Sequence, residues 1–362
     1  MLSGRTSLNF ELQTVIRTVI AVTALTALPG IARSGSEGDE ILSGFDLDAG
    51  QIERLKSGDV LAFSDGQYEQ TRRELAADAM VLVDSDLSTV LSALEESTTL
   101  IPMDVMIDHA LIESDADFAG VKFTADDMKE VEKLFDAKPG KDFNLGDDDL
   151  ALLEKFIGPH RDAGGPEKIE AASRAMRAIL NRRFQAYRES GLDGVDGYVR
   201  GRRTTVDVGA ELRLTTNTFL PFEDEFPEFI RVMTSYPQGA ECCVHQFRWL
   251  KVRLKKRPAF ALSHSIIQVM DDTVLITERY YYVSAQLNSV QITTAWVPYE
   301  DGGYLGLAVS ASADILDSLL GRMLRKLGRN MAEDLVTEAM LDIRQDLESR
   351  TSSDTGATVE DK

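Results

Sequence analysis

The sequence predicts an α+β fold in which a curved antiparallel sheet holds a long C-terminal helix, with a large helical insertion. Two observations carry this prediction. Between residues 240 and 312, five strand-like runs are separated by short turn segments, which is typical of an antiparallel meander. Directly after them, residues 313–347 keep a stripe of apolar side chains at helical spacing.

The N-terminus has the pattern of a secretory signal. A mildly basic start leads into the short apolar run 18–28, which is broken by Pro29 and Gly30 and followed by the small residue Ala32. The run is too short for a membrane-spanning helix, which needs about 20 apolar residues. We therefore expect a signal peptide over 1–32, a polar linker over 33–44, and export to the periplasm or the extracellular space; an uncleaved anchor and a chance apolar N-terminus are the alternatives.

Residues 45–113 contain two strand-like runs and one helix. Residues 79–83 form a compact β-type run, and Asp84 or Ser85 can cap the helix that follows it. Pro102 then interrupts the chain before a half-buried strand over residues 105–112.

Residues 114–236 are predicted to be mostly helical. An acidic helix opens with a capping pattern at Thr124, whereas the helix at about 167–189 carries several arginines on its outer face. Adjacent acidic and basic helices favour ion pairs within the molecule over two separate binding faces.

The C-terminal part, residues 237–348, holds the meander and the long helix. The predicted strands cover residues 244–254, 259–270, 274–284, 290–299 and 304–312. Gly321 and Gly328 lie on nearly the same face of the helix, and interior glycine weakens a helix, so they indicate close approach to a neighbouring element or a bound molecule. The polar tail 349–362 is predicted to be disordered.

Composition excludes some functions. The chain of 362 residues has 60 acidic and 39 basic side chains, a net charge of −21. That charge argues against a nucleic-acid partner and against broad adsorption to anionic lipid. The adjacent Cys242 and Cys243 are expected to be free thiols, and with four scattered histidines no metal-ligand spacing occurs, so we expect no metal and no redox cofactor.

The order of elements over residues 75–112 and 240–347 resembles the START-like, polyketide-cyclase-like superfamily with its helix-grip architecture. In that superfamily a first strand leads into short helices, and a second strand begins the meander that ends in the long helix. The resemblance makes 45–113 and 237–348 two parts of one domain, with 114–236 inserted between them. It implies a deep apolar cavity between the sheet and the C-terminal helix.

Candidate cavity residues follow from strand alternation. In a regular strand Glu278, Tyr280 and Tyr282 share one face, while His264 and Trp296 alternate with apolar residues. Apolar walls with a few polar groups are typical of a ligand pocket. We expect the pocket to be lined by His264, Glu278, Tyr280, Tyr282 and Trp296, and closed from the helix by Leu316, Leu320, Met323 and Leu327.

A basic hairpin stands out in this acidic chain. Its run of cations is Arg248, Lys251, Arg253, Lys255, Lys256 and Arg257, of which the last five are the candidate contact residues. Outward charges of this kind protect a hairpin from edge pairing. The functional interpretation is a local contact with an anionic lipid headgroup or membrane, and contact with a partner protein is a further alternative.

The leading hypothesis is an exported START-like protein that binds a hydrophobic or amphipathic small molecule, such as a lipid, between sheet and helix. One alternative is a cell-envelope protein interaction module with a filled core, which contacts its partner through the hairpin or the acidic insertion. Another is a cyclase-like or hydrolase-like enzyme that uses His264 and Glu278.

Overall fold

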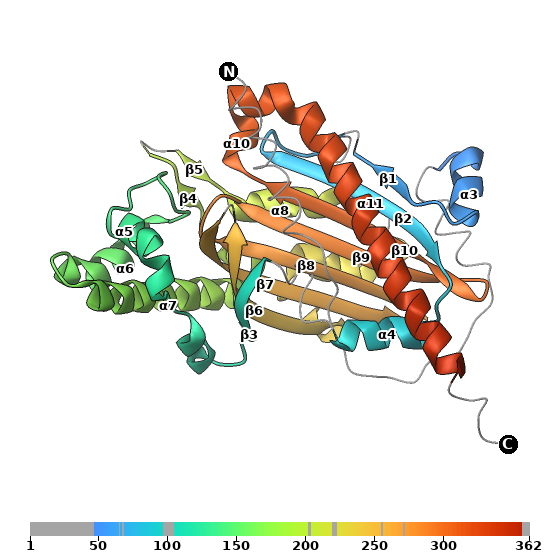
Figure 1. The fold of residues 1–362 in the computed structure, drawn as a ribbon, viewed down its shortest axis with the longest axis horizontal. Coiled ribbons are helices and arrows are strands. Elements are labelled where there is room, and N and C mark those ends of the chain that lie inside the picture. Colours follow the sequence, from blue (N-terminus) through green and yellow to red (C-terminus); the bar gives the residue numbers. More distant parts are fainter. Residues whose placement is uncertain are drawn as a thin grey trace.

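The computed structural model describes residues 47–64, 66, 69–96, 105–201, 204–218, 223–254, 256–270 and 272–356. The predicted signal peptide and linker lie outside these residues. The predicted α+β class, with a large antiparallel sheet and a long C-terminal helix, is confirmed (Figure 1).

Within the described chain, eight strands form one antiparallel sheet in the order β1-β2-β10-β9-β8-β7-β6-β3. Because β2 pairs with β10 and β3 pairs with β6, the strands before the insertion and those after it share one sheet. Strands β6 to β10 match the predicted ranges to within two residues. The strands are β1 Leu61–Phe63, β2 Glu74–Val83, β3 Met106–Leu111, β6 Val244–Leu254, β7 Arg257–Met270, β8 Thr273–Val283, β9 Ser289–Tyr299 and β10 Gly302–Ser312; β4 Tyr198–Val199 and β5 Thr205–Val206 form a separate pair.

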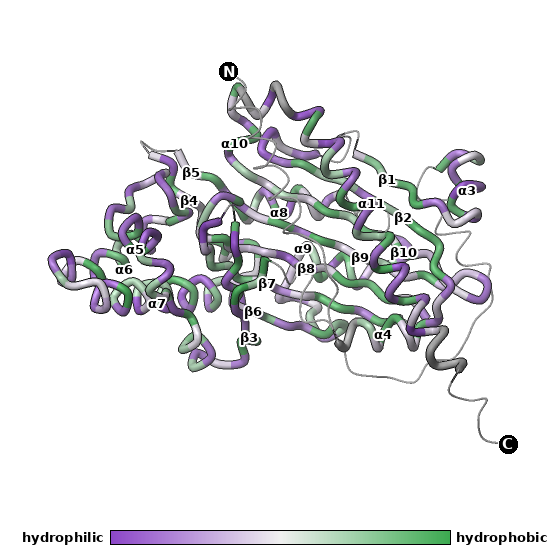
Figure 2. Tube along the Cα trace, in the orientation of Figure 1, coloured by the Kyte–Doolittle hydropathy of each residue, from purple (hydrophilic) through white to green (hydrophobic). Residues whose placement is uncertain are grey.

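Helices cover both faces of the sheet, which explains why the central strands β7 and β8 are buried along most of their length. Hydrophobic segments alternate with hydrophilic ones along these strands (Figure 2). Helix α11 crosses one face, and α8 lies behind the other (Figure 1). The described α-helices are α3 Ala49–Lys56, α4 Leu87–Glu96, α5 Met128–Phe135, α6 Asp147–Ile157, α7 Gly165–Ser190, α8 Val208–Thr216, α9 Pro227–Ser235, α10 Asp314–Asp317 and α11 Leu319–Gly356.

The predicted C-terminal helix is interrupted near its start. Ser318 has an extended backbone and separates α10 from α11, and its hydroxyl oxygen accepts a hydrogen bond from the Gly321 amide at 3.0 Å. A Cβ at Gly321 would overlap the Ile315 carbonyl oxygen and the Leu316 backbone. The glycine is therefore required by close packing against α10.

We expect Gly321→Ala to lower the free energy of unfolding by about 1–3 kcal/mol, because backbone atoms on both sides must move. Gly165→Ala is the matched control: this glycine begins α7, and an added Cβ would make only an ordinary contact with Met128. Urea unfolding of both variants measures the difference. Equal stability of the two variants would contradict the packing role of Gly321.

The start of the C-terminal tail is also helical. Helix α11 continues to Gly356, so the prediction of disorder from residue 349 is wrong for 349–356. Arg350 pairs with Asp346 one turn earlier at 2.8 Å, and the Thr351 hydroxyl donates to Ser85. Each added residue extends a helix that already exists, which costs less than starting a new one. Residues 357–362 lie outside the described chain.

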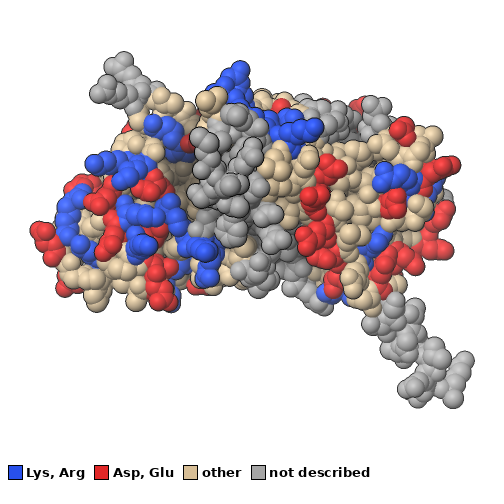
Figure 3. Space-filling model, turned by 45° about the horizontal axis from the view of Figure 1, so that its top comes forward, with Lys and Arg blue, Asp and Glu red and all other residues tan. Residues whose placement is uncertain are grey.

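The insertion forms its own core against one end of the sheet, and its ion pairs confirm the predicted internal charge pairing. Arg182 and Arg183 of α7 both pair with Asp149 of α6. Arg161, between the two helices, pairs with Glu154. Basic and acidic side chains accordingly alternate over this end of the molecule (Figure 3).

Candidate functional site

The two faces of the sheet hold different residues. We call the side that carries Ala261, Ser263, Ser265 and Ile267 of β7 the α11 face, since it shares its core with α4 and α11. The opposite side, with Phe260, Leu262, His264 and Ile266, is the α7 face, which packs against the helices of the insertion.

The predicted site residues divide between these faces. Glu278, Tyr280, Trp296 and Leu316 lie on the α11 face, as expected for a cavity beside the C-terminal helix. Leu327 is 38% exposed, so its predicted place in the cavity wall is wrong. The side chains of Leu320 and Met323 lie outside the described part of the structure.

Tyr282 lies on the α7 face, because strand β8 contains a bulge. Leu262 pairs with Tyr282 but Ser263 pairs with Tyr280, which leaves Tyr281 as the extra residue. One extra residue reverses the alternation beyond it. Tyr281 and Tyr282 consequently both pack in the insertion core, and the prediction that Tyr282 shares a face with Tyr280 is wrong.

His264 is also on the α7 face, opposite Glu278. In the register of β7 and β8, His264 pairs with Arg279 and Ser265 pairs with Glu278. Neighbouring residues of a strand point to opposite sides of a sheet. The hypothesis of an enzyme in which His264 and Glu278 share one pocket is therefore wrong.

A polar cluster lies in the middle of the otherwise apolar α11 face. Across β6, β7 and β8, Arg248 lies beside Ser263, Gln246 lies beside Ser265, and Ser265 in turn lies beside Glu278. Ser263, Ser265 and Glu278 are fully buried, and Arg248 is 6% exposed. Leu250, Ile267, Ile276 and Ile292 surround the cluster on the same face.

The two serines of this cluster are the unusual members. Neither Ser263 Oγ nor Ser265 Oγ has a hydrogen-bond partner in the described structure. On the same face the indole nitrogen of Trp296 is likewise buried without a partner there. Leaving a buried polar group unpaired costs about 1–3 kcal/mol, so such groups are expected to meet a partner in the working protein.

The polar cluster contains two side chains of opposite charge, Arg248 and Glu278. Burial lowers the pKa of Arg248, while the nearby Glu278 acts to raise it. The Arg248 guanidinium donates to Gln246 Oε1 at 3.1 Å. A cation and an anion side by side leave the cluster without a strong preference for a charged ligand group.

The α7 face holds a directed chain of hydrogen bonds. His245 Nε2 contacts the Ala240 carbonyl at 2.8 Å, and a carbonyl can only accept, so this nitrogen carries the hydrogen. Neutral His245 then accepts at Nδ1 from His264 Nε2 at 2.8 Å, and His264 accepts at Nδ1 from the Tyr187 hydroxyl at 2.9 Å. Burial lowers the pKa of both histidines, which agrees with two neutral rings.

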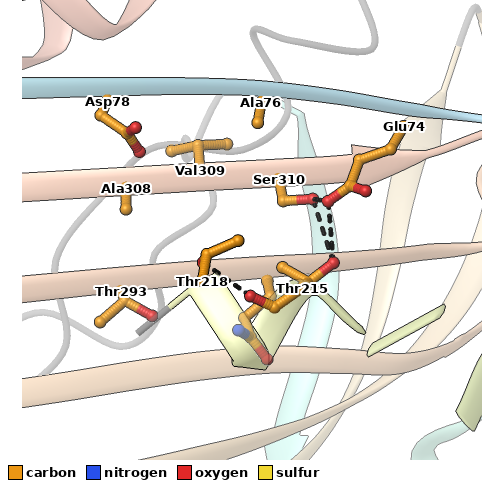
Figure 4. Close-up of a pocket in the computed structure, with 10 residues that line it drawn as sticks. Glu74, Ala76, Asp78, Thr215, Thr218, Thr293, Ala308, Val309 and Ser310 are labelled. Carbon is orange, nitrogen blue, oxygen red and sulfur yellow. Dashed lines mark hydrogen bonds between the residues drawn. The ribbon is translucent and has the colours of Figure 1, made fainter. Parts of the chain in front are cut away.

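A small polar cavity opens on the α7 side near the start of β2 (Figure 4). Glu74 Oε1 accepts hydrogen bonds there from Thr215 and Ser310, at 2.9 and 2.5 Å. The cavity has a volume of about 20 Å³, which suits a single water molecule. It is therefore too small for an organic ligand.

Two cations of the basic hairpin are neutralised by the insertion. Lys251 is buried and donates to Asp127 at 2.6 Å, and Arg257 pairs with Glu130. These pairs remove both residues from the predicted membrane contact. Arg253 and Lys256 stay exposed, and Lys255 lies outside the described residues, so a contact through them remains a prediction.

No protein-family model, curated protein or solved structure matches this chain. Within the described residues, no group of three or more His, Cys, Asp or Glu side chains could hold a metal ion. Nor does any described helix combine the length and apolar character needed to cross a bilayer.

Arg248 was predicted only as a member of the basic run, and Gln246, Ser263 and Ser265 were missed. A signal was present, since Ser263 and Ser265 flank His264 in a strand segment, 259–267, whose other residues are apolar. Polar residues at every second position of a doubly buried strand mark one face as special.

Proposed function

We propose that this protein binds a hydrophobic or amphipathic small molecule, lipid-like in character, on the α11 face of its sheet. The observation that carries the proposal is the pair of buried, unpartnered hydroxyls of Ser263 and Ser265 amid apolar side chains. Ligand sites combine mostly apolar walls with a few polar groups that orient the ligand. Glu278, Tyr280 and Trp296, three of the residues predicted from sequence, belong to this face.

The polar end of the proposed ligand is uncharged. Arg248 and Glu278 already oppose each other's charge, and an added ion would lose its hydration without gaining a counter-ion. The serine hydroxyls can both donate and accept, which suits an alcohol or a carbonyl group. A long-chain alcohol is the simplest molecule of this kind.

The START-like resemblance is part of the proposal. It is supported by the pairing of β2 with β10 and of β3 with β6, which a domain split by an insertion requires. It is supported also by the shared core of α4, α11 and the long strands on one side of the sheet.

The test is displacement of a neutral naphthylamine fluorophore by a long-chain fatty alcohol from the full-length protein. We expect saturable binding, weakened about tenfold in the double variant Ser263→Ala/Ser265→Ala, because two hydrogen-bond partners are lost. Mass spectrometry of an organic extract of the purified protein should also show a co-purifying lipid.

A matched control removes two buried hydroxyls from the opposite face. Thr277 and Thr293 bond to each other at 2.9 Å, and Thr277→Val/Thr293→Val replaces both partners at constant shape. This variant should bind the alcohol as the native protein does. Absence of saturable binding, or equal affinity of the serine variant, would refute the proposal.

A further inference from the structure

The two adjacent cysteines form an unusual pair that the proposed binding face does not include. Cys242 Sγ and Cys243 Sγ lie 2.7 Å apart, and both thiols are free and half-buried. A disulfide places its sulfur atoms about 2.0 Å apart, so the two sulfur atoms need to move closer by less than about 1 Å. Because adjacent Cα atoms lie only about 3.8 Å apart, closer than in most disulfides, the peptide bond between the two cysteines must also distort when the bond forms.

The two thiols share the same surroundings. Cys242 and Cys243 both pack against the apolar cluster of Phe229, Ile230 and Ile266. Burial and the neighbouring Cys242 raise the pKa of the Cys243 thiol. Whichever thiol forms a mixed disulfide first, the other lies close enough to displace the small thiol from it.

The pair adjoins the hydrogen-bond chain of the α7 face. Ala240 and Cys242 belong to the short 3-10 helix η6, Ala240–Cys242, and Cys243 leads directly into β6. The Ala240 carbonyl is the last acceptor of the chain that runs from Tyr187 through His264 to His245. Movement of η6 would thus alter the partner of His245.

We infer that Cys242 and Cys243 are a redox modification site, at which a small-molecule disulfide converts the dithiol to a vicinal disulfide and thereby shifts the bond between Ala240 and His245. In the first step the thiolate of one cysteine attacks the small disulfide, forms a mixed disulfide and releases one thiolate. In the second, the other cysteine loses its proton and attacks the protein sulfur of that mixed disulfide, and the second thiolate leaves. The protein gives up two electrons and two protons, and the small disulfide is reduced to two thiols.

The test treats reduced, full-length protein with oxidised glutathione and follows the intact mass. We expect a loss of about 2 Da without a lasting adduct, because the second thiol resolves the mixed disulfide. Cys243→Ser and Cys242→Ser should each accumulate the glutathione adduct, because the remaining thiol has no neighbour to resolve it. A lasting adduct on the native protein, or a native mass that does not change, would overturn the inference.

Nitrogen NMR of the histidine rings measures the consequence. Oxidation should shift the ring signals of His245 and His264. His109 and His160, which do not belong to this chain of hydrogen bonds, serve as internal controls. Formation of the disulfide with unchanged His245 signals would refute the coupling. Neither outcome depends on the proposed ligand, since both cysteines lie away from the α11 face.

Discussion

Asp149→Asn is expected to lower the free energy of unfolding by about 3–5 kcal/mol, because it leaves a buried guanidinium without its counter-ion. Asp149 is fully buried, and its Oδ2 accepts from Arg183 Nε at 3.0 Å and from Arg183 Nη2 at 2.5 Å. The same oxygen accepts the Gly146 amide, and Oδ1 accepts from Arg182. One carboxylate thus joins α6, α7 and the loop before α6.

The neighbouring residue supplies a matched control. The side chain of Asp148 is 77% exposed and contacts Arg182 at 3.4 Å, so Asp148→Asn should cost about 0.5 kcal/mol or less. Urea unfolding followed by tryptophan fluorescence compares the two variants, with Trp249 on the insertion side reporting locally. A similar small effect of both substitutions would show that the buried pair does not hold the helices of the insertion together.

The free energy of unfolding should fall as the pH drops through the range about 7.0 to 5.5, at up to about 1.4 kcal/mol per pH unit for each of two histidines, the buried His264 and the half-buried His245. Burial, then His245 and Arg279, hold the pKa of His264 well below its ordinary value, and burial lowers the pKa of His245. In the unfolded chain both rings take up a proton near pH 6.5, while the folded chain does not. The contribution to stability is therefore complete above that pH and is lost towards the lower folded pKa.

The groups around His264 explain why protonation is resisted. Tyr187 of α7 and His245 of β6 both contact its ring nitrogens, Phe247 stacks on it at 4.4 Å, and Arg279 lies beside it in the register of β8. Among these neighbours are a second imidazole, that of His245, and the Arg279 guanidinium, but no carboxylate. A charged His264 would therefore be both desolvated and repelled.

His264→Gln should reduce the pH slope of stability over the same range, although the variant is less stable at neutral pH. His160→Gln, at the surface beside Arg174, should keep the native slope. Urea unfolding at a series of pH values measures both. If His264→Gln keeps the native slope, the dependence originates elsewhere in the chain.

Much of the fold could be predicted because strand and helix periodicities are local. Turn residues between β6 and β10 separate strand-like runs of similar length, and the limits of these strands were predicted to within two residues. The break at Ser318 was missed, because it depends on α10 folding back beside Gly321 and not on the residues of the helix itself.

The candidate site was only half predictable. Glu278, Tyr280 and Trp296 could be placed on one face by counting alternate residues, and they do share it. Counting failed at Tyr282, because a bulge depends on how two strands align and leaves no mark in the composition of one strand. Ser263 and Ser265 were overlooked since serine alone carries no chemistry until its lack of a partner is known.

The sequence by itself determined the elements, the acidic and basic character of the insertion helices, and the apolar nature of the strands, because each depends on residues close together in the chain. Tertiary structure decided the rest. It neutralised Lys251 and Arg257 with Asp127 and Glu130, separated His264 from Glu278, and joined Tyr187, His264 and His245 in one chain of hydrogen bonds. These contacts join segments that are far apart in the sequence, and only the pairing of the strands and the packing of the insertion against the sheet bring them together.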